Sequence, residues 1–121
     1  MPDDPVRAAA DLPDAPAWVA HPSGTDCGTV RLDEDLALPA SGRDCLAEAS
    51  AAGRDAVLRW VLRTTEGDPV PHFARTDGHG GAVVASTSAW DAYGADGWTE
   101  YRCAVLADLP YGESCTSDDD G

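Results

Sequence analysis

Apolar and polar residues alternate along the middle of the chain. From Ala56 to Thr64, the residues Leu58, Trp60 and Leu62 fall on one side, and valines and arginines fall on the other. A period of two is typical of a β-strand that packs one face against a core, and the arginine-bearing face is expected to be partly solvated. Similar runs separated by glycine-containing turns predict further strands over residues 70–76, 82–88 and 98–106. The pattern therefore predicts an antiparallel β-meander of about four strands.

One helix is expected ahead of this meander. The spacing of Ser41 and Asp44 is typical of a capping box, and Gly53 is a typical residue at the end of a helix. Between them, Cys45 and Ala49 share one face at helical spacing, so the cysteine is expected to point inward. A short strand is expected before the helix, over residues 29–32. One helix packed on one face of an antiparallel sheet makes the predicted fold class α+β.

The two ends of the chain differ in composition from its middle. Residues 1–26 are rich in Pro, Ala and Asp and show no apolar period, which predicts a flexible tether. Trp18 is the exception, and we expect it to dock on the domain. Residues 116–121 predict an acidic disordered tail. The ordered part is then a single α+β domain over residues 27–115.

The net charge limits the partners of the protein. The 121 residues include 22 acidic and 8 basic side chains, which gives a formal charge of −14, and all eight basic residues are arginines. A surface this acidic repels nucleic acid and anionic lipid, so we expect neither as a partner. No apolar run is long enough to predict a transmembrane segment. The absence of Lys, Ile, Asn and Gln indicates a high-GC genome, such as that of an actinobacterium.

Four cysteines indicate the compartment in which the protein works. They stand at Cys27, Cys45, Cys103 and Cys115, and none forms the close C-x-x-C pair that is typical of a zinc site. In a small chain, two disulfides explain this number better than a metal site or unpaired core thiols do, although three pairings remain open. Disulfides predict an extracellular or cell-envelope protein. Because the chain shows no signal peptide, we expect the export signal to lie outside it.

No familiar catalytic or cofactor motif is present in the sequence. There is no P-loop, no dinucleotide-binding fingerprint and no G-x-S-x-G nucleophile elbow. Asp77 and His79 could share a metal ion, but a polar turn explains them equally well, and the acidic runs lack EF-hand spacing. Glu66 and Asp68 could act as an acid–base pair, but both lie in one turn without a visible apolar pocket. We therefore expect no cofactor and assign no catalytic or metal-binding residue.

Two short motifs carry a resemblance to a known family. Residues 64–70 read TTEGDPV, and residues 91–94 read DAYG. Together with the late cysteines Cys103 and Cys115, these motifs resemble a family of small secreted bacterial proteins, often lipoproteins, that is classed as a domain of unknown function. The resemblance implies export and no assigned reaction. It also implies a lipid anchor on the full-length precursor, although no lipobox is present in this chain.

The resemblance further implies one disulfide pairing and a set of candidate residues. A bridge between Cys103 and Cys115 belongs to the family pattern, which leaves Cys27 to pair with Cys45. The candidate binding residues are those of the two motifs, namely Thr65, Glu66, Gly67, Asp68, Pro69, Asp91, Tyr93 and Gly94.

These observations predict a non-catalytic secreted or cell-envelope domain that acts as a binding or structural module. Its partner is expected to be an unknown protein or a small ligand. One alternative is an acidic inhibitor or immunity-type protein that binds a basic protein partner. Another is a small hydrolase that uses Glu66, Asp68 or Asp91. Convergence of these three residues and Tyr93 in one pocket would favour a ligand-binding or enzymatic role.

Overall fold

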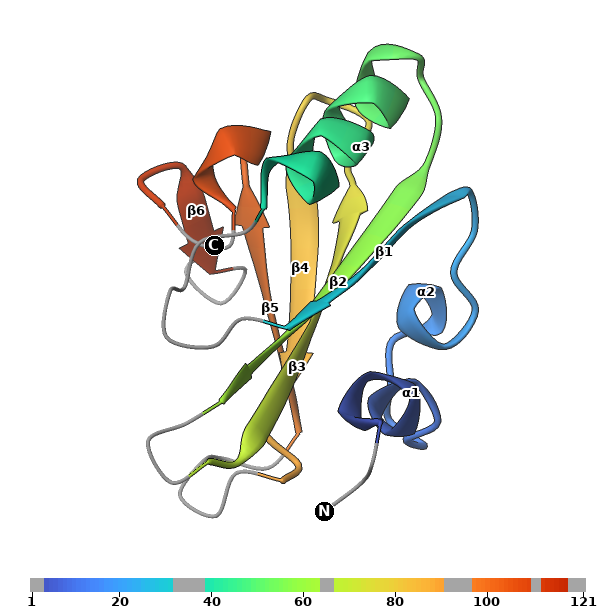
Figure 1. Ribbon diagram of the computed structural model, residues 1–121, viewed down its shortest axis with the longest axis vertical. Helices are drawn as coiled ribbons and strands as arrows, with labels where there is room; N and C mark the ends of the chain where they lie inside the picture. The colour runs from blue at the N-terminus through green and yellow to red at the C-terminus, as the bar shows by residue number, and fades with distance from the viewer. Residues whose placement is uncertain (1–3, 32–38, 64–66, 91–96, 110–111, 118–121) are drawn as a thin grey trace.

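Six β-strands form one sheet in the computed structural model of the chain (Figure 1). The structure describes residues 4–31, 39–63, 67–90, 97–109 and 112–117. The strands lie in the order β1-β2-β3-β4-β5-β6, so neighbours along the chain are neighbours in the sheet. Their bounds are Thr25–Arg31, Ala56–Arg63, Pro69–Thr76, Ala82–Thr87, Trp98–Cys103 and Cys115–Ser117.

The sheet is mixed. Strand β1 runs parallel to β2, and helix α3 (Ala40–Ala51) lies on the connection between them. From β2 to β6, each strand pairs antiparallel with the next. The predicted α+β class is confirmed, and the antiparallel meander is present from β2 to β5, but the sheet has six strands and not about four, because β6 extends it and β1 joins it in parallel. Periodicity shows that a segment is a strand and not which neighbour it joins, and β6 is too short to show a period.

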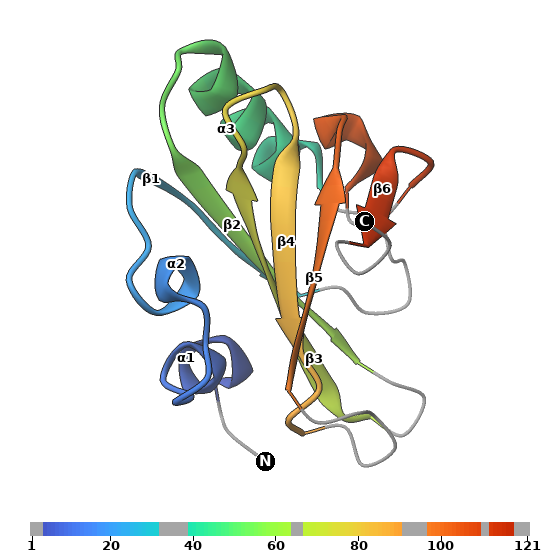
Figure 2. The same cartoon turned by 180° about the vertical axis from the view of Figure 1, so that it is seen from behind.

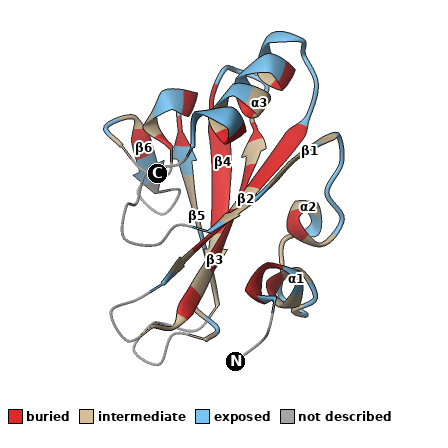
Figure 3. Cartoon of the chain, in the orientation of Figure 1, coloured by how far each residue is buried: buried red, intermediate tan, exposed pale blue. Residues whose placement is uncertain are grey.

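Helix α3 covers one face of the sheet (Figure 1; burial in Figure 3). Leu46 and Ala49 of the helix are buried in one cluster with Leu58 and Trp60 of β2. This packing confirms the predicted inward side of β2. Gly42 lets the helix approach closely, because a Cβ atom at this position would lie 3.1 Å from Leu58 Cδ1. No described helix, including α3 with its 12 residues, is long and apolar enough to cross a membrane.

The prediction is right for the C-terminal end of α3 and wrong for its N-terminal end. At the C-terminal end, Gly53 has a φ of +70° and donates its N–H to the Ser50 carbonyl at 3.1 Å, so the predicted stop is confirmed. At the other end, the helix begins at Ala40 with Pro39 in the N-cap position and no side-chain capping bond. The predicted capping box is therefore wrong, and Ser41 lies inside the first turn.

The opposite face of the sheet carries the N-terminal arm, which holds helices α1 (Pro5–Ala10) and α2 (Ala17–Ala20) (Figure 2). Apolar residues of the arm are buried in a second cluster with residues of β2, β3 and β4. The cluster comprises Val6, Ala9, Val19, Val61, Phe73 and Ala85. The sheet is thus covered on both faces, and not on one as predicted.

The arm differs from the flexible tether that composition predicts for residues 1–26. Two short helices occupy most of this stretch, and Thr25 already belongs to β1. Pro5 lies at the start of α1 and Pro16 at the N-cap of α2, positions where proline is compatible with a helix. Helices of six and four residues are also too short to show an apolar period. Trp18 does dock on the sheet, as expected.

Both predicted disulfides are confirmed. Cys27 of β1 is bonded to Cys45 of α3, and Cys103 of β5 is bonded to Cys115 of β6. The first bridge ties the helix to the edge of the sheet, and the second closes the last strand pair across the 3-10 helix η1 (Leu106–Asp108). The predicted tail over residues 116–121 begins inside β6, and residues 118–121 lie outside the described residues.

Candidate ligand-binding face

The family motifs lie largely outside the described residues. The motif residues that cannot be placed are Thr65, Glu66, Asp91, Tyr93 and Gly94. Of those that can, Gly67 has a φ of +87°, and its carbonyl accepts a hydrogen bond from the Arg63 guanidinium at 3.0 Å. Pro69 is buried at the start of β3, and Asp68 is half-buried beside it. These contacts give Gly67 and Pro69 a structural role in the connection between β2 and β3. That the two motifs converge in one pocket stays a prediction.

The turn between β3 and β4 accounts for the Asp77 and His79 pair. The Asp77 carboxylate accepts the backbone N–H of His79 at 2.7 Å and that of Gly81 at 3.0 Å. Burial raises the pKa of Asp77, but these two hydrogen bonds, together with the nearby charge of Arg102, outweigh burial and leave the pKa below its usual value. Among the described residues, no three His, Cys, Asp or Glu side chains are grouped so that they could hold a metal ion.

His72 belongs to the core on the α3 side of the sheet. Its ring stacks on Trp60 with centroids 5.4 Å apart and an interplanar angle of 13°. Its Nδ1 lies 3.0 Å from the Val70 carbonyl, which requires the proton on that nitrogen. Burial lowers the pKa of His72 from 6.5 to about 4, and the bond to Val70 offsets only part of this effect. His72 is therefore a neutral core residue at physiological pH.

Arginines gather on the face of the sheet that carries the arm. Directly paired residues share a face, and Arg75 pairs with Val83, which in turn pairs with Arg102. Six of the eight arginines of the chain lie on this side, namely Arg7, Arg31, Arg59, Arg63, Arg75 and Arg102. On a protein with a formal charge of −14, these arginines offset part of the negative charge on this side of the sheet.

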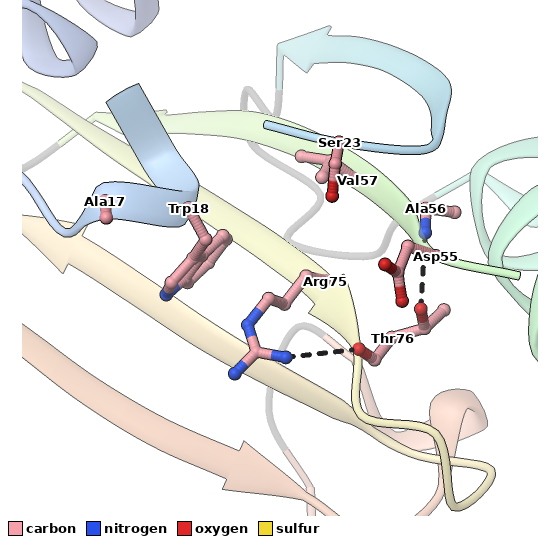
Figure 4. A pocket seen from close by; sticks show the side chains of 8 residues that line it. All are labelled: Ala17, Trp18, Ser23, Asp55, Ala56, Val57, Arg75 and Thr76. Atoms are coloured by element: carbon pink, nitrogen blue, oxygen red, sulfur yellow. Dashed lines mark hydrogen bonds between the residues drawn. The ribbon is translucent and has the colours of Figure 1, made fainter. Parts of the chain in front are cut away.

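A hollow of about 290 Å³ opens on this face, between α2 and the strands β2 and β3 (Figure 4). Trp18 of the arm forms one wall, and the Arg75 side chain extends beside it. Val57 contributes a buried apolar floor, while Ser23 and Asp55 are exposed at the rim. An apolar hollow with a few polar groups around it is the usual form of a small-ligand site.

Arg75 lacks an acidic partner in this hollow. Its guanidinium carbon lies 5.4 Å from the centroid of the Trp18 ring, within the range of a cation–π contact. Its Nη1 makes a long bond of 3.5 Å to the Thr76 carbonyl, and its Nε is buried without a hydrogen-bond acceptor. No carboxylate among the described residues forms an ion pair with it. A buried donor without an acceptor costs about 1–3 kcal/mol, so the described residues satisfy the guanidinium only in part.

Arg59 shows what a paired arginine on the same face looks like. Its Nη1 donates to Asp26 Oδ1 at 2.8 Å, and the same oxygen accepts the N–H of Gly28 at 2.8 Å. The Gly28 bond, followed by the Arg59 bond, holds the pKa of Asp26 below its usual range. Arg59 thus has a carboxylate partner, whereas Arg75 has none among the residues that the structure describes.

Sequence reasoning did not identify Trp18 and Arg75 as a site. Alternation in β3 places Arg75 on the same side as Phe73, so the face of this arginine could be predicted from the sequence. Its meeting with Trp18 could not be predicted, because the contact depends on how α2 packs across the sheet.

No protein-family model matches the chain, and no curated protein and no solved structure is significantly similar to it. The candidate site therefore rests on geometry and charge. The resemblance of the two motifs to a family of secreted proteins stays a prediction.

Proposed function

We propose that the protein is an exported binding module that takes a small carboxylate ligand in the hollow between Trp18 and Arg75. The observation that carries this proposal is the half-buried Arg75 guanidinium, which has no carboxylate partner among the described residues although the chain has 22 acidic side chains. A bound carboxylate would accept charge-assisted hydrogen bonds from this group, each worth about 1.5–3 kcal/mol.

The overall negative charge does not exclude such a ligand. At physiological ionic strength, charges more than about 8 Å apart are largely screened, so local groups decide the affinity of a bound anion. The nearest cation is Arg75 itself, and the Trp18 ring and Val57 beside it offer apolar contact. The long-range field is expected to slow association more than it weakens the bound state.

The carboxylate of Asp55 limits the charge that a ligand of this hollow can carry. Its exposed carboxylate lies at the rim of the same hollow, in view beside Ala56 and Thr76 (Figure 4). A ligand that carries only negative charge would be repelled by this group. A ligand with a carboxylate for Arg75 and an ammonium group for Asp55 would satisfy both. We therefore expect a small amino-acid-like zwitterion to bind better than a simple organic acid.

Export is the second part of the proposal. Two disulfides persist in an oxidising compartment, and in this fold they join β1 to α3 and β5 to β6. The resemblance of the two motifs to secreted lipoproteins supports the same location, with a lipid anchor on the precursor. Mass spectrometry of protein purified under oxidising conditions tests this part, and finding four free thiols would contradict it.

Thermal unfolding with matched ligands tests the site. The probes are the twenty amino acids at millimolar concentration, together with the N-acetyl and amide forms of each one that binds. A ligand well above its Kd stabilises the folded state by about 2–3 kcal/mol, which raises Tm by several degrees. We expect zwitterions to raise Tm most, N-acetyl forms less and amides least.

Two variants show whether the effect belongs to the hollow. Arg75→Gln should abolish the rise in Tm, and Arg54→Gln, an exposed arginine outside the hollow, should keep it. The proposal is wrong if no amino acid stabilises the wild type, or if Arg75→Gln responds to the ligand as the wild type does.

A further inference from the structure

Strand β1 is the terminal strand of the sheet. It pairs in parallel with β2 on one side, and no strand among the described residues pairs with its other side. A bulge between Asp26 and Thr29, with Gly28 at a φ of +95°, interrupts its first half. The regular part is therefore Thr29–Arg31. Main-chain groups along such an edge can accept a further strand.

A groove runs beside this part of β1. A hollow of about 340 Å³ is lined by the consecutive residues Thr29, Val30 and Arg31, by Val61 of β2 and by the first turn of α1. A second hollow, of about 520 Å³, is lined by Arg59 of β2, by Phe73 of β3 and by both helices of the arm, so the space lies over the arm-bearing face next to the edge. The two hollows share Thr29 and the start of α1, so they form one β1-edge groove. Figures 1 and 2 both show the arm beside β1 and β2.

The β1-edge groove reaches the main chain of the strand. Side chains of successive strand residues point to opposite faces, yet three successive residues line the groove. The Val30 side chain packs with the α3 cluster on the other face, so its contribution to the groove comes from the backbone. A peptide lying here would therefore meet backbone N–H and C=O groups as well as side chains.

Charge selects among the segments that could lie in the groove. Arg7 and Arg31 are exposed along it, and neither guanidinium has a hydrogen-bonding partner among the described residues. The acidic groups beside them are Asp4, which caps α1, and Asp26, which is paired with Arg59. Because the lining carries three arginines, Arg7, Arg31 and Arg59, against these two carboxylates, its net charge is positive and complements an acidic segment.

We propose that an extended acidic peptide segment of another protein docks in the β1-edge groove and pairs as a short strand with Thr29–Arg31. Its acidic side chains would face Arg7 and Arg31. A second copy of this chain is a poorer occupant, because each copy has a formal charge of −14 and the two would repel one another. This site shares no lining residue with the Arg75 hollow and binds a different class of ligand.

Selection from a random heptapeptide library displayed on phage tests the proposal. The wild type should enrich acidic, proline-free sequences over the double variant Arg7→Glu, Arg31→Glu. Both side chains are exposed, so this variant should still fold, which its circular dichroism and Tm will show. The best peptide is then synthesised and its Kd measured by fluorescence anisotropy. We expect the double variant to bind at least about tenfold more weakly, since charge-assisted hydrogen bonds are lost.

Three further measurements separate strand pairing from other modes of binding. N-methylation of alternate peptide bonds should abolish binding, and amide hydrogen exchange at residues 29–31 should slow when the unmodified peptide binds. Arg54→Glu, at an exposed arginine that lines neither hollow of the groove, should leave the Kd unchanged. The proposal is overturned if the wild type enriches nothing over the double variant or if methylated peptides bind equally well. It is also overturned if sedimentation shows a dimer that the double variant loses.

Discussion

The fold is expected to lose about 3 kcal/mol of stability between about pH 7 and pH 4 because of the buried side chain His72. In the folded state its pKa is about 4, because burial beside Trp60 disfavours the charged ring. In the unfolded chain its pKa is 6.5. Between these two values the unfolded state binds more protons than the folded state. The free energy of unfolding therefore falls as the pH falls through this window, and His72 adds no further change below it.

The size of the effect follows from the two pKa values. The loss should reach about 2 kcal/mol at about pH 5 and about 3 kcal/mol at about pH 4. Three carboxylates, those of Asp26, Asp77 and Asp108, also have lowered pKa values in the folded state. Their contribution is lost as the pH falls through and below their ordinary pKa of 3.8, so the interval from about pH 7 to about pH 5 belongs mainly to His72.

Urea unfolding at several pH values, with both disulfides intact, measures this slope. The variants His72→Gln and His72→Phe should both flatten the profile between about pH 7 and pH 5, whatever their absolute stability. His79→Gln, at an exposed turn, controls for the loss of a histidine as such and should follow the wild type. If the wild type and both His72 variants gave parallel profiles, the reasoning on burial would be refuted.

Three further predictions concern the bridges, the helix and the site. Replacing Cys103 and Cys115 with serine should cost about 3 kcal/mol, because their bridge closes a loop with a sequence separation of 12, and an unchanged Tm would contradict this. Gly42→Val should cost about 1–3 kcal/mol in urea unfolding, because even its Cβ would lie 3.1 Å from a β2 side chain, whereas Ala47→Val on the exposed side of the same helix should cost much less. Arg75→Met should unfold at the same Tm as the wild type or higher and bind no amino acid, because it keeps apolar contact with the arm and removes a charge that lacks a partner. A drop of several degrees in its Tm would show that Arg75 is mainly structural.

The parts of the fold that depend on local pattern could be predicted from the sequence. The alternation from Ala56 onward identifies β2 and its inner side, and Gly53 marks the end of α3 with the positive φ that glycine tolerates. The start of α3 differs from the prediction because the N-cap position is occupied by Pro39, which forms no side-chain capping bond, and Ser41 lies inside the first turn. Both bridges were predicted, but through a family resemblance and not through the residue pattern, which left three pairings open.

The parts that depend on contacts between distant segments could not be predicted in the same way. Parallel pairing of β1 with β2 requires the chain to cross over through α3. The residue pattern of the Thr25–Arg31 segment does not indicate whether the strand pairs in parallel or antiparallel. The arm was read as a tether because its prolines suggest disorder, although two of them stand at helix starts. Its burial relies on residues of β2, β3 and β4 that lie far from it in the chain.

The candidate site follows from this same dependence on distant contacts. Strand alternation assigns Arg75 to one face of the sheet. An arginine on an uncovered sheet face would be solvated by water and would form no site. Helix α2 packs across that face and brings the Trp18 ring to within 5.4 Å of the guanidinium carbon, and this approach creates one wall of the hollow. The arm is held mainly by Val6, Ala9 and Val19, with one hydrogen bond of 3.2 Å from Trp98 Nε1 to Asp14. The contact that makes Arg75 a candidate ligand-binding residue is therefore supplied by a segment that composition alone assigns to a flexible tether.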